Sequence, residues 1–142
     1  MRISDVIRRK GDLVVTIRSD ATVEKLLDLL EEHKIGAVVV SDDGFTPSGI
    51  VSERDVVRHL HSDGVAVLEE SVATIMTTDV ETCTPDDRID AMARTMTERR
   101  IRHIPVLVDG KLSAIVSIGD IVKWRIDELQ YERDQLVGYI QQ

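Results

Sequence analysis

The sequence predicts a mixed α/β (α+β) protein: two β-α-β-β-α units packed by pseudo-twofold symmetry, followed by a long C-terminal helix. Three observations predict this fold: a repeat within the chain, apolar runs typical of buried strands, and stretches with apolar residues at helical spacing. The chain has 142 residues, of which 42% are hydrophobic and 31% charged. This balance is typical of a globular protein, and the length suits two small units that share one core.

An internal repeat relates the two halves of the chain. Residues 16–44 align with residues 82–110 at an offset of 66 positions, and residues 49–58 align with residues 114–123 at an offset of 65. The matches fall in the same order in both blocks, which indicates a duplicated unit. A unit of about 45 to 60 residues has little core of its own, so we expect the two units to pack face to face.

The first unit carries strand and helix signals in the order β-α-β-β-α. Apolar residues at helical spacing follow Asp20 and Thr22, either of which is a natural helix cap. Two later apolar runs, separated by the turn residues Asp42-Asp43-Gly44, indicate buried strands. We expect a strand at 13–18, a helix at 20–35, strands at 37–40 and 49–52, and a helix at 53–61.

The second unit repeats this order of elements. We expect a strand at 80–84, a helix at 86–101, strands at 103–108 and 112–117, and a helix from 118 onward. The predicted domains are the first unit with its N-terminal lead-in (1–62), a linker with a short helical piece (63–79), the second unit (80–125) and a helical extension (126–142).

The last helix carries a coiled-coil-like apolar stripe formed by Val122, Ile126, Leu129, Leu136 and Ile140. In one interpretation this stripe packs on the protein's own units. In the other it forms the seam of a homodimer, and the spacing fits both.

The composition excludes several function classes. A net charge of −8 argues against binding of nucleic acids or anionic membranes, and no apolar run approaches the roughly 18 to 20 residues of a membrane helix. The start of the chain leaves no room for a signal peptide, and a single cysteine, Cys83, excludes an internal disulfide and a multi-cysteine metal site. We therefore expect a cytoplasmic protein without a metal site.

The same four-residue motif, Ser-x-x-Asp, occurs where each unit's last strand meets its last helix. Ser52 with Asp55 and Ser117 with Asp120 occupy these equivalent positions. The motif is an ordinary helix cap, and it also lies where helix N-terminal N–H groups attract phosphate. The two copies differ, because Arg54 in the first is replaced by Gly119 in the second.

These features together resemble a pair of cystathionine β-synthase (CBS) domains, most closely the small stand-alone bacterial CBS-pair proteins. The tandem units and the Ser-x-x-Asp motifs carry the resemblance, with Ile75-Met76-Thr77 and the run from Arg102 to Val106. It covers about residues 5 to 125. The resemblance implies a non-enzymatic sensor that holds AMP, ADP, ATP or NAD(H) between its units and transmits binding through packing or dimer rearrangement.

The resemblance also implies roles for individual residues. The acidic residues of the two motifs would bind ribose hydroxyls, the serines would lie near phosphate or ribose, and Arg54, Arg102 and His103 would face phosphate. Adenine would lie among aliphatic residues and backbone groups, because the chain is only 3% aromatic. The candidate ligand-binding residues are Thr16, Ile35, Ala37, Ser52, Arg54, Asp55, Met76, Thr77, Thr82, Ile101, Arg102, His103, Ile104, Pro105, Ser117, Gly119 and Asp120.

A second hypothesis is a ligand-free dimerisation or adaptor module that acts through its C-terminal helix. An enzyme is not expected, because the sequence contains neither a Gly-rich phosphate loop nor a recognisable catalytic constellation. The expected partners are an adenosine nucleotide, a second copy of the chain and a regulated protein that the sequence does not identify.

Overall fold

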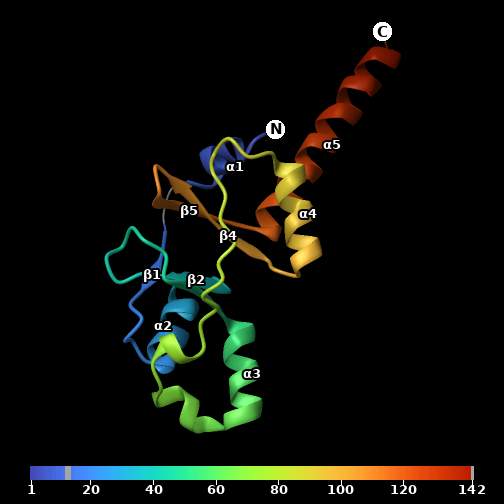
Figure 1. Cartoon of the computed structure of the whole chain (residues 1–142). Helices are drawn as coiled ribbons and strands as arrows, with labels where there is room; N and C mark the ends of the chain where they lie inside the picture. The colour runs from blue at the N-terminus through green and yellow to red at the C-terminus, as the bar shows by residue number, and fades with distance from the viewer. Residues whose placement is uncertain (12–13, 142) are drawn as a thin grey trace.

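The computed structural model describes residues 1–11 and 14–141 (Figure 1). Leu13, where the first predicted strand begins, and Gln142, the end of the predicted helical extension, lie outside the described residues. In chain order the elements are α1 (Ile3–Lys10), β1 (Thr16–Ile17), α2 (Val23–His33), β2 (Ala37–Val40), β3 (Gly49–Ser52), α3 (Glu53–Asp63), the 3-10 helices η1 (Val65–Glu69) and η2 (Val72–Thr74), α4 (Ile89–Arg99), β4 (His103–Val108), β5 (Lys111–Ser117) and α5 (Ile118–Gln141).

Each unit is built around a small sheet. In the first, β2 lies between β1, to which it is parallel, and β3, to which it is antiparallel. In the second, β4 and β5 form an antiparallel pair that ends with His103 opposite Ser117. The mixed α/β fold with a long C-terminal helix is therefore as the sequence predicted.

The strand predicted at 80–84 is wrong, because it is reduced to a single parallel bridge between Cys83 and Val106. The Thr84 backbone N–H donates to the carboxylate of Asp87 at 2.7 Å, which turns the chain away from β4 directly after Cys83. The following helix, α4, consequently begins at Ile89 rather than at 86.

The helices after β1 and after Cys83 end in the same way in both units. Thr22 caps α2 by accepting a hydrogen bond from the Lys25 N–H at 3.1 Å. The residues that terminate α2 and α4, Lys34 and Arg100, are both left-handed, with φ of 55°. This sharp ending leads the chain into β2 and β4, whose first residues face the space between the units.

The two units exchange segments to complete their cores. Ile3 and Val6 of the lead-in helix α1 are buried in the core of the second unit, although the sequence grouped this lead-in with the first. Conversely, Val72 and Ile75, in the segment expected to be a linker, are buried in the core of the first unit. Figure 1 shows α1 beside β5, far from α2 and α3. Each unit is thus completed by the segment that precedes the other.

The helix α5 starts on the second unit and then leaves it. Ile121 is buried in the second core, but the side chains from Ile126 to Ile140 on the predicted stripe are between 47% and 79% exposed. Figure 1 shows the C-terminal half of α5 projecting away from both units. Val122, the first residue of the stripe, is also 49% exposed, so the interpretation in which this stripe packs on the protein's own units fails along its whole length. Across the described ranges, no helix is both long and apolar enough to span a bilayer.

Candidate functional site

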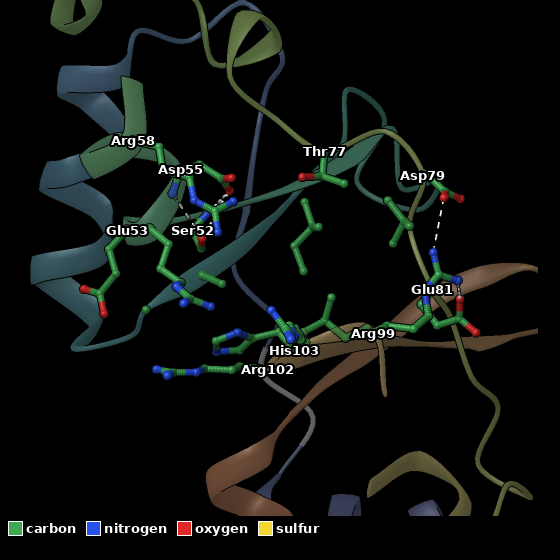
Figure 2. A pocket seen from close by; sticks show the side chains of 17 residues that line it. Ser52, Glu53, Asp55, Arg58, Thr77, Asp79, Glu81, Arg99, Arg102 and His103 are labelled. Carbon is green, nitrogen blue, oxygen red and sulfur yellow. Dashed lines mark hydrogen bonds and ion pairs between the residues drawn. The ribbon is translucent and has the colours of Figure 1, made fainter. Parts of the chain in front are cut away.

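A cleft of about 200 Å³ lies between the two units (Figure 2). The first unit contributes the start of β2, part of β3 and the first turns of α3. The opposite wall of the cleft is formed by the chain from Thr77 to Glu81 and by the junction between α4 and β4. Because both units supply its walls, a ligand in this cleft would contact both at once.

The acidic residue of the first motif lies at the cleft with half of its carboxylate unused. Asp55 accepts hydrogen bonds through Oδ2 from the Ser52 N–H at 2.8 Å and from the Ser52 hydroxyl at 3.1 Å, and Ser52 Oγ caps α3. Its other oxygen, Oδ1, receives no hydrogen bond from the described residues. The cap and a ligand role are therefore compatible, since one oxygen serves the helix and the other remains available at the cleft.

Arginine side chains converge on this cleft from both units. Arg54 and Arg58 come from α3, and Arg100 and Arg102 come from the end of α4 and the residues before β4. None of these four forms an ion pair with a residue in the described ranges. Arg99 differs, because Asp79 at 3.2 Å and Glu81 hold its guanidinium group (Figure 2). These four guanidinium groups outnumber Glu53 and Asp55, the carboxylates at the cleft that form no ion pair within the described residues, so the cleft favours anions in a chain of net charge −8.

His103 lies at the base of the cleft as the first residue of β4. Burial lowers its pKa, as does the charge of Lys10, and the opposing effects of Asp120 and Glu53 leave the pKa below the usual histidine value. The ring is therefore neutral near pH 7 and can both donate and accept a hydrogen bond. Gly36 leaves room for the Glu53 side chain at this wall of the cleft, because a Cβ at position 36 would lie 3.3 Å from Glu53 Oε1.

The second motif has different surroundings. Asp120 Oδ2 accepts from the Ser117 N–H at 2.9 Å and also from the ammonium group of Lys10 at 2.7 Å. Burial would raise the pKa of Asp120, but the hydrogen bonds from Lys10 and Ser117 and the Lys10 charge lower it below the usual aspartate value. This carboxylate is therefore ionised and already paired with a cation from α1.

The structure brings about half of the predicted site residues together. Those that line the cleft are Ala37, Ser52, Arg54, Asp55, Thr77, Ile101, Arg102 and His103. Those that do not line it are Thr16, Ile35, Met76, Thr82, Ile104, Pro105, Ser117, Gly119 and Asp120. Among the latter, Ile104 is fully buried in the second core, and Thr16 pairs with Val39 inside the first sheet.

Several lining residues were not singled out from the sequence. They include Gly36, Ile50, Glu53, Arg58, Val80, Arg99 and Arg100. Arg58 had a usable signal, since it follows Arg54 by four residues and so lies on the same helix face. The others are brought to the cleft by the packing of the two units.

A family comparison accounts for nearly the whole chain. The CBS domain family model matches residues 3–62 and 72–127. A mitochondrial CBS domain-containing protein of Arabidopsis thaliana is 35% identical over 147 residues, which cover 98% of this chain and 71% of that protein.

Solved structures show the same arrangement. A CBS-domain containing protein from Agrobacterium tumefaciens superposes with a TM-score of 0.85 at 42% identity, covering 88% of this chain and 99% of that one. A CBS domain pair solved in complex with 5′-methylthioadenosine and S-adenosyl-L-methionine has a TM-score of 0.79 at 22% identity, covering 90% of this chain and 98% of that one. The second likeness shows a common fold.

Proposed function

The chain belongs to the CBS domain family, and on that premise we propose that it is a non-catalytic regulatory module that binds one adenosine nucleotide in the cleft between its units. CBS pairs are regulatory modules, and the observation that carries the more specific proposal is the cleft itself. Within one space of about 200 Å³ it combines a half-used carboxylate, a helix N-terminus and four guanidinium groups that form no ion pair within residues 1–11 and 14–141.

Asp55 is the expected ribose ligand. A ribose presents two neighbouring hydroxyl donors, and Oδ1 of Asp55 can accept them as charge-assisted hydrogen bonds while Oδ2 continues to bind Ser52 at the start of α3. The base would lie along Ala37, Ile50 and Ile101, where aliphatic side chains and backbone groups line the cleft. The related CBS pair solved with methylthioadenosine and S-adenosylmethionine supports adenosine as the recognised part, since both of its ligands contain it.

The charge of the cleft favours a ligand with several phosphates. Arg54 and Arg58 approach from the first unit and Arg100 and Arg102 from the second, so phosphates between them would draw the two walls together. ADP, ATP and NAD(H) satisfy more of these cations than AMP does, and each can form bidentate contacts with arginine. Because the two walls belong to different units, occupancy would change the packing of one unit on the other, the step that a regulatory module needs.

The experiment is calorimetric titration of nucleotide-stripped protein with AMP, ATP and NADH, on wild type, Asp55→Asn and Asp120→Asn. Asp55→Asn keeps the shape of the side chain but removes its charge, so Kd should rise roughly 10- to 150-fold, the equivalent of about 1.5 to 3 kcal/mol for hydrogen bonds to a charged group. Asp120→Asn is the matched control, because it changes the equivalent residue of the other unit and should leave this Kd within about twofold. Equal affinity of Asp55→Asn and wild type, or no saturation at millimolar ligand, would refute the proposal.

A second candidate function rests on α5. Its exposed apolar stripe, from Ile126 to Ile140, has no partner among the residues the structure describes. An adaptor that dimerises through this stripe would need no ligand in the cleft. Removal of residues 128–142 should then convert a dimer into a monomer in sedimentation analysis. Loss of the regulatory effect together with the dimer, in a protein that binds no nucleotide, would favour this alternative.

A further inference from the structure

Lys10, the last residue of α1, occupies the second Ser-x-x-Asp motif from within the chain. Its ammonium group donates to Asp120 Oδ2 at 2.7 Å and to the Ile115 carbonyl at 2.7 Å. We propose that Lys10 closes the second motif to ribose, so that the chain takes nucleotide at only one of its two equivalent motifs. This inference rests on the proposed function and names the residue that makes the pair one-sided.

The repeat shows what contacts the carbonyl equivalent to that of Ile115 in the other unit. Ile115 corresponds to Ile50 at an offset of 65 residues. Ile50 exchanges two backbone hydrogen bonds with Thr77, each at 2.9 Å. In the second unit, the carbonyl of Ile115 receives the Lys10 ammonium group instead. The same place in the fold is filled by neutral backbone beside Asp55 and by a cation beside Asp120.

The last turn of α1 is fixed over Asp120 by further contacts. Arg9 forms an ion pair with Asp127 of α5 at 2.7 Å, and its guanidinium group lies 4.6 Å from the centre of the Trp124 ring. A cavity of about 270 Å³ remains beside Asp120, but its lining residues belong only to α1 and α5. The first motif faces a cleft between the units, whereas Asp120 of the second lines a space between α1 and α5.

Hydrogen-bond strength favours the contact of Asp120 with Lys10 over a contact of Asp120 with ribose. The Lys10–Asp120 contact is a charge-assisted hydrogen bond between partly buried groups, with side chains 31% and 24% exposed. A ribose hydroxyl is neutral, so replacing the ammonium group would exchange a charged donor for a weaker one and leave Lys10 without its partner. Oδ1 of Asp120, like Oδ1 of Asp55, accepts no hydrogen bond within residues 1–11 and 14–141, so the difference lies in charge: a ribose at Asp120 would meet a carboxylate that Lys10 already neutralises through Oδ2.

The test is titration with ATP of wild type, Asp55→Asn, Asp55→Asn/Lys10→Met, and the triple variant that also carries Asp120→Asn. Lys10→Met keeps an unbranched side chain but removes its charge, and the 31% exposure of the Lys10 side chain makes the fold tolerant of the change. We expect one site in wild type, at least tenfold weaker binding in Asp55→Asn, recovery of one site in the double variant, and loss again in the triple variant. Lys10→Gln in the Asp55→Asn background keeps a donor for the Ile115 carbonyl and replaces the methionine variant if circular dichroism shows that the latter is unfolded.

Each outcome has a distinct meaning. Two sites in wild type, or no recovery in the double variant when wild type binds ATP, would overturn the role of Lys10 and leave the proposed function standing. Binding by the double variant when wild type binds none would support the role of Lys10 and overturn the assignment of the first motif. No binding by any of the four proteins would overturn both.

Discussion

Gly49→Ala is expected to disrupt the backbone hydrogen bonds that join β3 to the segment after η2. A Cβ at position 49 would lie 2.8 Å from the sulfur of Met76 and 2.8 Å from the carbonyl oxygen of Thr77. The Met76 side chain can move, but the Thr77 carbonyl is fixed, because it accepts a backbone hydrogen bond from Ile50 at 2.9 Å and Thr77 N–H donates to Ile50 in return. The added methyl group therefore separates these two backbone segments.

The magnitude follows from these contacts. Two lost backbone hydrogen bonds contribute about 0.5 to 1.5 kcal/mol each, and overpacking of a methyl group costs typically about 1 to 3 kcal/mol. We expect the free energy of unfolding to fall by about 2 to 6 kcal/mol. Since Ile50 and Thr77 both line the cleft, nucleotide affinity should fall as well.

The assay is urea denaturation followed by far-ultraviolet circular dichroism, with Gly138→Ala as the matched control. Gly138 lies inside α5, and an added methyl group there would meet no described atom within 4 Å, so alanine should stabilise the helix by about 0.5 to 1 kcal/mol. A Gly49→Ala variant within about 0.5 kcal/mol of wild type would refute the close-approach reasoning.

Two further predictions concern titrating groups. Burial, reinforced by Asp87, raises the pKa of the Cys83 thiol to about 12. At about pH 8 the thiol should therefore react with a thiol reagent at least a thousandfold more slowly in the native protein than in concentrated urea. Equal rates would contradict its burial. Asp120→Asn should destabilise the protein at neutral pH and lose this effect in acid, because a carboxyl whose folded pKa is lowered contributes stability above its unfolded pKa of about 3.9 and loses it as the pH falls through the folded value. A destabilisation that stays constant from pH 6 to pH 3 would count against the Lys10 contact.

The repeat predicted most of the fold, because the same signals had to hold in both halves. β2, β3 and β4 lie where the apolar runs placed them. The strand predicted at 80–84 was wrong because pairing stops at Cys83, where the Thr84 N–H bonds the Asp87 carboxylate, a contact that apolar spacing does not reveal. The exchange of Ile3 and Ile75 between the units was also invisible, since it depends on which face each unit leaves open.

The site was only partly accessible to sequence reasoning for a related reason. The motif residues Ser52 and Asp55 are close together in sequence, so a local pattern could find them. The arginines that line the cleft with Asp55 come from two units, and Arg100 is brought to the cleft by the left-handed turn that ends α4. No local pattern distinguishes it from a helix-terminal arginine that faces solvent.

The asymmetry of the pair follows from how the two units are completed. The sequence located the difference between the motifs at Arg54 and Gly119, within the motifs themselves. The structure adds a larger difference outside them: an eight-residue helix ending in Lys10 completes the second unit, whereas an extended segment at Met76 and Thr77 completes the first. Because the carboxylate of Asp120 is paired with an ammonium group and that of Asp55 forms no ion pair within the described residues, a duplicated fold can carry one ligand site. The segments that join the units, rather than the repeated motifs, then decide which site that is.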